Sequence, residues 1–299
     1  MQSLQLVKGE NMKFQKIGKV NPDKKYKIKP MEFADNSMLK RLNYLLGFIK
    51  ERNSESLLNY VDQLSTTIKS LIDSSKASKL KLDVSEKVTK FTNLKEFEDL
   101  VGLHYDFLFK ILDLSKDEIT TEEFDVPSRN YWLMVFGIHY YQLLALTEVI
   151  EREEAIELFK EYIDEYYVFI KSSFTKFETL EEMRKDNIKE TESDDDPEFD
   201  VVASTVENGV YIIRNNNCPA VEALEDYEDK ELVYVTCCYG DFQYAKMSNE
   251  HFVMTRDYTI AQGDPYCDKV FHDTRIDKEI KHPTKEFLDN MGPIMKKNE

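Results

Sequence analysis

Reactive side chains of three kinds gather in residues 249–273. Cys267 supplies a thiol, Arg256 a guanidinium that can hold an anion, and His272 an imidazole that titrates near neutral pH. On either side of residues 262–265 (Gln-Gly-Asp-Pro), apolar and polar residues alternate, which is typical of half-buried strands joined by a tight turn. We therefore expect a β-hairpin that forms one wall of a site.

All four cysteines lie in the last third of the chain, at Cys218, Cys237, Cys238 and Cys267. Cys218 precedes a proline that suits the first turn of a helix over residues 220–227, and the amide donors at a helix start stabilise a thiolate. We expect the thiols to be reduced, which leaves packing, metal binding or nucleophilic chemistry as their roles.

The segment around Cys237 and Cys238 allows two readings. Residues 230–239 suit a helix, but the strand formers at 232–236 favour a strand almost as well. In either conformation two adjacent side chains point in different directions, so only one of these thiols can serve a site. Asp241 follows closely and is the nearest carboxylate along the chain.

Apolar residues recur at helical spacing from about residue 36 to 187. We expect helices over residues 38–49, 54–71, 93–111, 128–149, 151–174 and 179–187. Asn93 and Glu96 have the spacing of a capping box, and His104 falls on the apolar face of its helix, where a packed histidine is expected. Beyond a run of charged residues at 189–198, an Asn208-Gly209 turn joins strands over 199–205 and 210–214.

The fold class predicted from this order is α+β, with a helix-rich N-terminal two-thirds and a small antiparallel sheet with flanking helices in the C-terminal third. We expect a basic flexible leader over 1–35, since the first thirty residues carry eight Lys against two acids. A helical region follows over 36–190, of which 93–190 could pack with the C-terminal part. An acidic linker over 191–198 precedes an α+β region over 199–299.

The formal charge of the 299-residue chain is −17, which argues against nucleic acid or an anionic membrane surface as its main partner. No secretory signal and no transmembrane run of about 18 apolar residues can be read from the sequence. We expect a cytoplasmic protein with a small-molecule partner, and a homo-oligomer is compatible with the sequence.

Several short motifs follow one another in a fixed order towards the end of the chain. They are Cys218-Pro219, residues 238–241 (Cys-Tyr-Gly-Asp), 252–256 (Phe-Val-Met-Thr-Arg) and 259–271 (Thr-Ile-Ala-Gln-Gly-Asp-Pro-Tyr-Cys-Asp-Lys-Val-Phe). Together they resemble the L-2-amino-thiazoline-4-carboxylic acid hydrolase family. The resemblance covers about residues 199–273 and could extend into the helices from about 93, whereas residues 1–90 lie outside it.

The resemblance implies a hydrolase that opens a small cyclic amidine to an N-carbamoyl-cysteine. Carried over by position, its candidate functional residues are Cys218, Cys238, Asp241, Arg256, Asp264 and Cys267. We expect Cys238 to act as the nucleophile, Asp241 as base or amidine holder, and Arg256 as a clamp on the substrate carboxylate. Cys218 and Cys267 would complete the pocket, with Asp264 and His272 binding substrate.

A second reading makes the same region a non-catalytic sensor of small molecules or zinc. Residues 263–268 (Gly-Asp-Pro-Tyr-Cys-Asp) also resemble vinyl-reductase-type binding domains, and Cys218, Cys238 and Cys267 with one further ligand could hold zinc. No cofactor is expected for the hydrolase reading. Structural roles also stay open: Arg256 could form a salt bridge, Asp264 a turn cap, and His272 an exposed strand end.

Overall fold

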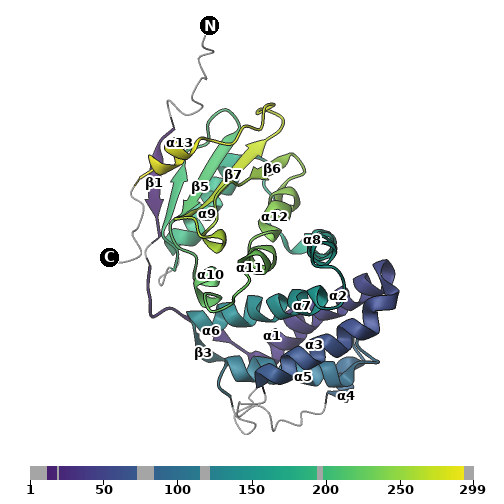
Figure 1. Ribbon diagram of the computed structural model, residues 1–299. Coiled ribbons are helices and arrows are strands. Elements are labelled where there is room, and N and C mark those ends of the chain that lie inside the picture. The colour runs from purple at the N-terminus through teal and green to yellow at the C-terminus, as the bar shows by residue number, and fades with distance from the viewer. Residues whose placement is uncertain (1–11, 19, 73–83, 115–121, 194–197, 293–299) are drawn as a thin grey trace. The chain divides into compact units, whose positions relative to one another are not determined.

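The computed structural model describes residues 12–18, 20–72, 84–114, 122–193 and 198–292. The chain divides into a sheet unit, from the segments Met1–Lys24, Ile170–Val221 and Tyr239–Glu299, and a helical unit, from Lys25–Phe169 and Glu222–Cys238. The predicted α+β class is confirmed, because helices dominate the N-terminal part and an antiparallel sheet lies in the C-terminal third (Figure 1). Among the described residues, no helix is long and apolar enough to span a membrane.

The helical unit consists mainly of amphipathic helices that bury their apolar faces against one another. Its longer helices are α2 (Leu39–Arg52), α3 (Leu57–Ile72), α5 (Glu98–Ile111), α7 (Ile138–Thr147), α8 (Arg152–Phe169) and α11 (Lys230–Cys237). Its shorter elements are α1 (Pro30–Phe33), α4 (Ser85–Val88), α6 (Ser128–Trp132) and the strands β2 (Lys25–Ile28) and β3 (Phe124–Pro127). Helix α3 packs on α5 and α7, and α7 on α8, as the apolar periodicity predicts.

The predicted capping box is wrong, although its helix exists. Helix α5 begins at Glu98 after Phe97, and no side chain caps it. Asn93 is hydrogen-bonded to Asn43 instead. Its backbone N–H donates to Asn43 Oδ1 at 2.8 Å, and its side-chain amide donates to the Asn43 backbone carbonyl. The Asn93 side chain, which the local motif predicts to cap the helix, thus makes a tertiary contact.

Two buried histidines form a polar chain inside the helical unit. His104 Nδ1 lies 2.8 Å from the Leu100 carbonyl, and the Gln142 amide donates to His104 Nε2 at 3.3 Å. The Gln142 carbonyl accepts from His139 Nδ1 at 2.8 Å. Both rings are thus satisfied as neutral imidazoles, which agrees with the prediction that His104 is packed.

This chain predicts that the helical unit loses stability in acid. Burial lowers the pKa of His104 from 6.5 to about 4, although its bond to the Leu100 carbonyl opposes the shift. The unfolded state therefore binds a proton between these values that the folded state does not, so the free energy of unfolding falls by about 3 kcal/mol as the pH drops through that window. Urea unfolding followed by fluorescence of Trp132, the single tryptophan, measures this unit.

His104→Gln should flatten this pH dependence between about 6.5 and 4 relative to wild type. His251→Gln is the matched control, because the His251 side chain is 46% exposed and lies in the sheet unit. An unchanged slope in His104→Gln would show that other groups cause the acid sensitivity.

The sheet unit is built on five antiparallel strands in the order β1-β4-β5-β7-β6. The strands are β1 (Phe14–Ile17), β4 (Val201–Ser204), β5 (Val210–Asn215), β6 (Phe252–Thr255) and β7 (Cys267–Asp273). The helices of this unit are α9 (Leu180–Ser193), α12 (Gly240–Ser248) and α13 (Lys285–Asp289), while α10 (Pro219–Ala223) spans the boundary between the units.

Both predicted hairpins form. Asn208 and Gly209 have φ angles of 51° and 76°, the left-handed values that the predicted two-residue turn between β4 and β5 requires. Strands β6 and β7 pair with Phe252 opposite Asp273 and Thr255 opposite Val270. Their connection is longer than a tight turn, because a 3₁₀ segment (Ile260–Gln262) precedes Gly263.

Ordered strands occur where a flexible leader was expected. Strand β1 pairs with β4 at the edge of the sheet, and β2 pairs with β3 in the helical unit. Lysines on an edge strand can point to solvent while one residue, here Ile17, is buried, so a basic composition is compatible with pairing. The parts of the expected leader at 1–11 and 19, and of the acidic linker at 194–197, lie outside the described residues.

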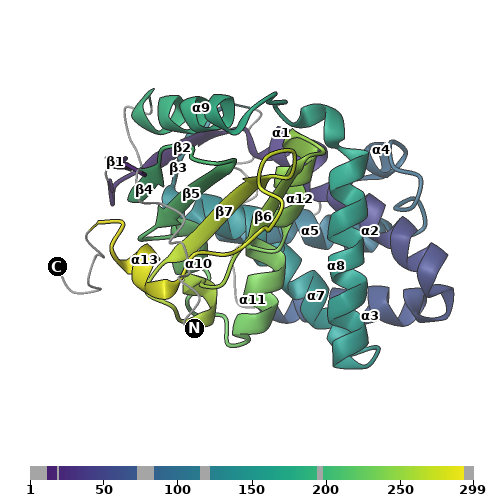
Figure 2. The ribbon, with the colours of Figure 1, turned by 90° about the horizontal axis from the view of Figure 1, so that it is seen from above.

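Each face of the five-stranded sheet packs on different helices. One face carries Ile17, Ala203, Tyr211, Phe252 and Phe271, which pack with residues of α9 and α12. The opposite face carries Val202, Ile212 and Val270, which pack with Leu288 and Met291. Figure 2 shows α9 and α13 on opposite sides of the strands.

Candidate functional site

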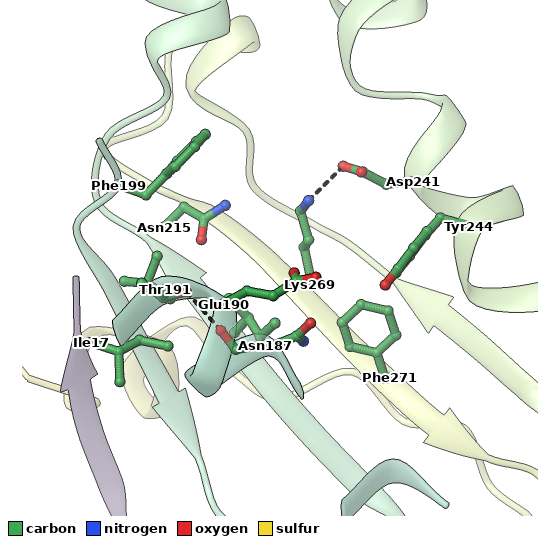
Figure 3. Close-up of a pocket in the computed structure, with 12 residues that line it drawn as sticks. Ile17, Asn187, Glu190, Thr191, Phe199, Asn215, Asp241, Tyr244, Lys269 and Phe271 are labelled. Atoms are coloured by element: carbon green, nitrogen blue, oxygen red, sulfur yellow. Dashed lines mark hydrogen bonds and ion pairs between the residues drawn. The ribbon is translucent and has the colours of Figure 1, made fainter. Parts of the chain in front are cut away.

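A cavity of about 320 Å³ lies on the face of the sheet that α9 and α12 cover. Its lining is mixed, with apolar side chains from the sheet and polar ones from both helices and β7. The lining residues are Ile17, Asn187, Glu190, Thr191, Phe199, Val201, Ile213, Asn215, Asp241, Tyr244, Lys269 and Phe271 (Figure 3). A volume of this size suits a small organic molecule.

Strand alternation selects which residues of β7 reach this cavity. Lys269 and Phe271 line it, and Cys267 lies on the same side because it precedes Lys269 by two positions. The neighbouring strand β5 contributes Asn215 opposite Cys267 and Ile213 opposite Lys269. Lys269 and Asn215 are therefore polar residues on an inner face that also carries Ile213 and Phe271.

One carboxylate sits between two cations at the cavity wall. Lys269 Nζ lies 3.0 Å from Asp241 Oδ2, and Arg256 Nη2 lies 2.5 Å from the same oxygen. Asp241 occupies the first turn of α12, and Arg256 follows the last residue of β6. Figure 3 shows the Lys269 ammonium reaching towards Asp241 from the strand.

The two cations hold Asp241 in its ionised form. Burial by itself would raise the pKa of this carboxyl, but Lys269 and Arg256 outweigh it, and the net pKa is lowered from its usual value. Burial likewise opposes the charged form of Lys269, but Asp241 raises the net pKa of the ammonium. At neutral pH Asp241 is thus a stable hydrogen-bond acceptor and a weak base, and Lys269 is a cation.

Helix α9 supplies a polar stripe to the cavity. Asn187, Glu190 and Thr191 follow the i, i+3, i+4 spacing that places side chains on one helix face. We expected this helix to end at 187 and a linker to begin at 191, because the acidic run lacks apolar periodicity. The helix continues to Ser193, and Lys189, Glu190 and Glu192 in this stretch are good helix formers.

The structure places Arg256 outside the cavity lining, although we expected it to hold the substrate carboxylate. The Arg256 side chain is only 2% exposed and does not line the cavity. Its Nε donates to the Asp268 carbonyl at 3.0 Å, and its guanidinium lies over the Phe242 ring. Lys269, at 25% exposure, is the cation that faces the cavity.

The candidate cysteines are divided between the two units. Cys218 and Cys267 belong to the sheet unit, and Cys238 ends α11 in the helical unit, where the helical reading of 230–237 is confirmed. Cys267 is buried, and its Sγ accepts a hydrogen bond from the Ile260 N–H at 3.2 Å. Helix α10 after Cys218 has only five residues, so it offers less support for a thiolate than the longer helix we predicted.

Asp264 and His272 have structural partners. Asp264 Oδ2 accepts from the Thr259 N–H at 2.8 Å, which makes it a turn cap. His272 is fully buried and shares its side of β7 with Val270, whose side chain packs in the cluster on the face opposite the cavity. The predicted substrate contact of His272 is therefore incompatible with a ligand in this cavity.

All four cysteines are free thiols in the structure. Within the described ranges, no three His, Cys, Asp or Glu residues come together in a group that could hold a metal ion.

Sequence reasoning missed several residues of the cavity: Asn187, Glu190, Thr191, Asn215, Tyr244 and Lys269. For Lys269 a signal was present, since a lysine two positions after Cys267 and two before Phe271 must share their face of a strand. Tyr244 could not be found in this way, because helix α12 itself was not predicted.

The comparisons with known proteins concern the part of the chain that contains this cavity. No curated protein and no solved structure matches the chain. A family model matches residues 134–271, which include α9, α12, β5 and β7 as far as Phe271, and thus Asp241, Arg256 and Lys269. This match confirms the resemblance drawn from the short motifs: residues 134–271 are similar to the L-2-amino-thiazoline-4-carboxylic acid hydrolase family.

Proposed function

We propose that the chain is a hydrolase that opens a small cyclic amidine such as 2-amino-thiazoline-4-carboxylate to N-carbamoyl-cysteine. The observation that carries the proposal is that the family match covers every residue that lines the cavity except Ile17, including the Lys269–Asp241 ion pair. A cytoplasmic location, which free thiols favour, is part of the same proposal.

The reaction consumes one water and needs no redox partner. In the overall change, the water oxygen becomes bonded to the ring carbon between nitrogen and sulfur, and the carbon–sulfur bond of the ring breaks. The sulfur leaves as a thiol after gaining a proton, and the former ring carbon becomes the carbonyl of a carbamoyl group. All atoms of the substrate and the water are thus present in one product.

The polar groups of the cavity match the two charged ends of this substrate. Lys269 can donate to the substrate carboxylate, the role we had expected of Arg256. Glu190 lines the cavity and can accept from the protonated amidine. Asp241 orients Lys269, because its lowered pKa makes it a poor general base.

Cys238, which belongs to the helical unit and does not line the cavity, is the nucleophile proposed from the sequence motifs. A thiolate is a competent nucleophile towards an amidinium carbon: it adds to the ring carbon, the ring carbon–sulfur bond breaks, and the substrate sulfur leaves as a thiol after gaining a proton. Water then attacks the same carbon and displaces the Cys238 sulfur, which regenerates the thiol and leaves the carbamoyl product. Cys238 is the C-cap residue of α11 and lies two positions before the first residue of α12.

Cys238→Ser is expected to lower kcat by at least about 100-fold, because a hydroxyl ionises far less readily than a thiol. Turnover is measured by mass spectrometry of N-carbamoyl-cysteine, with Cys237→Ser as the matched control and Cys267→Ser as the variant on the cavity side of β7. Wild-type turnover by Cys238→Ser would remove the nucleophile role. Failure of wild-type protein to form N-carbamoyl-cysteine would overturn the proposed substrate.

A further inference from the structure

Arg256 is the most deeply buried member of the charged group at the cavity, and it cannot touch a ligand there. Its side chain is 2% exposed, its Nε donates to the Asp268 carbonyl, and its guanidinium lies 5.7 Å from the Phe242 ring centroid. These contacts hold the guanidinium against Asp241, and Arg256 is not among the residues that line the cavity. A buried cation in such a position acts on the cavity only through Asp241.

The charges of this group do not cancel. Arg256 and Lys269 each carry one positive charge, Asp241 carries one negative charge, and both cations contact the same oxygen, Oδ2. One positive charge is left over, and only Lys269 of the two cations lines the cavity. Without Arg256, Lys269 and Asp241 would form a neutral pair, and a ligand carboxylate would compete with Asp241 for the ammonium.

We propose that Arg256 is a positioning residue that gives the cavity its affinity for carboxylates. Its positive charge compensates the negative charge of Asp241, so the charge of Lys269 remains available to the ligand. The inference rests on the proposed function for the identity of the ligand, but the charge argument comes from the geometry alone. It also explains why a guanidinium is buried beside the cavity without lining it.

Other charged and titratable groups near Lys269 do not replace Arg256. Glu190 on α9 is negative and lines the same cavity, so it suits the cationic end of a ligand. Tyr244 on α12 lines the cavity as a neutral phenol, because burial raises its pKa. Cys267 lies on the same side of β7 as Lys269 and, as a thiolate, would favour the ammonium.

Binding measurements on four proteins test this role. Wild type, Arg256→Gln, Arg256→Lys and the double variant Arg256→Gln/Asp241→Asn are titrated by calorimetry with 2-amino-thiazoline-4-carboxylate and with 2-amino-thiazoline, which lacks the carboxylate. Arg256→Gln should weaken binding of the carboxylate by about tenfold or more and leave the second compound bound at least as well. Arg256→Lys should retain most of the affinity.

The double variant decides between an electrostatic and a purely structural role. It removes one positive and one negative charge, so Lys269 again carries the single positive charge of the group. Affinity for the carboxylate should therefore recover towards the wild-type value. Equal loss of both compounds in Arg256→Gln, without recovery in the double variant, would overturn the proposal.

A second measurement does not depend on the substrate. The pH dependence of Lys269 modification by an amine reagent, read by peptide mass spectrometry, reports the pKa of the ammonium. Because Arg256 lowers this pKa and Asp241 raises it, Arg256→Gln should move the profile to higher pH. A move to lower pH would indicate a loosened, hydrated ion pair and would overturn the inference.

The binding measurements and the Lys269 modification profile together distinguish a failure of this inference from a failure of the proposed function. If wild-type protein binds neither thiazoline, the proposed substrate is wrong, and the direction of the Lys269 profile still decides whether Arg256 controls the charge at the cavity. If wild-type protein binds the carboxylate but Arg256→Gln binds it equally well, the proposed function stands and the role of Arg256 is refuted.

Discussion

Lys269→Met is expected to lower kcat/KM for 2-amino-thiazoline-4-carboxylate by about 100-fold, since a charged hydrogen bond to a partly desolvated carboxylate is worth roughly 2 to 3 kcal/mol. Methionine keeps the length of the side chain and removes only the ammonium. The change should raise KM more than it lowers kcat, because Lys269 binds the end of the substrate that does not react. Steady-state kinetics with detection of the product thiol measures both constants.

The fold should tolerate this substitution. Asp241 loses one cation but keeps Arg256 at 2.5 Å, so no buried carboxylate is left unpaired. Lys246→Met is the matched control, because Lys246 is exposed in the last turn of α12 and does not line the cavity. Wild-type kcat/KM in Lys269→Met would show that the substrate carboxylate binds elsewhere.

Lys269 illustrates what the sequence could predict about the site and what it could not. The strand from Cys267 to Asp273 and its pairing with β6 follow from alternation and a glycine-containing connection, and both are observed. Alternation alone does not say which face meets the cavity, because both faces of the sheet are covered by helices. That choice depends on α9 and α12, whose packing is not local information.

Arg256 was assigned to the site for a sound chemical reason, but its side chain is buried beside the cavity and does not line it. A guanidinium near a carboxylate substrate is a reasonable expectation. The sequence does not reveal that Arg256 is covered by the Phe242 ring and already pairs with Asp241. Whether a charged side chain reaches a cavity or supports one that does is decided by tertiary packing.

Helices were predicted more reliably than their ends. The apolar stripes of α3, α5 and α8 identify them because each buries one face. Helix α12 escaped prediction because its mean amphipathicity is weak and its first turn, Gly240-Asp241, resembles a loop. Helix α12 also places Asp241 at the cavity wall, but this placement cannot be read from the spacing of apolar residues.

The second large effect is expected at the opposite face of the sheet, in a buried chain of polar groups. His272 Nδ1 lies 2.8 Å from Asp277 Oδ2, and its Nε2 lies 3.0 Å from Thr255 Oγ1. Thr255 Oγ1 in turn lies 2.8 Å from His282 Nδ1, and His282 Nε2 approaches Asp268 Oδ2 to 2.9 Å. The chain joins β6 and β7 to the segment that follows them.

Asp277→Leu is expected to destabilise this part of the sheet by about 1 to 3 kcal/mol, because it leaves a buried imidazole N–H without its acceptor. His272 is fully buried and the Asp277 side chain is 3% exposed, so water cannot replace the lost contact without opening the sheet. Hydrogen exchange of peptides that cover β6 and β7 measures the local free energy of opening.

Asp277→Asn separates the hydrogen bond from the charge. An amide oxygen can still accept from His272 Nδ1, so this variant should lose less stability than Asp277→Leu if the hydrogen bond is the main contribution. Asp257→Leu is the matched control, because its side chain is 56% exposed and lies 3.8 Å from His282 Nε2, and it should change the free energy of opening by no more than about 0.5 kcal/mol. Equal exchange in wild type and Asp277→Leu would mean that this polar chain does not hold β6 and β7 together. The expected loss would instead identify His272, which the sequence suggested as a substrate-binding residue, as a structural one.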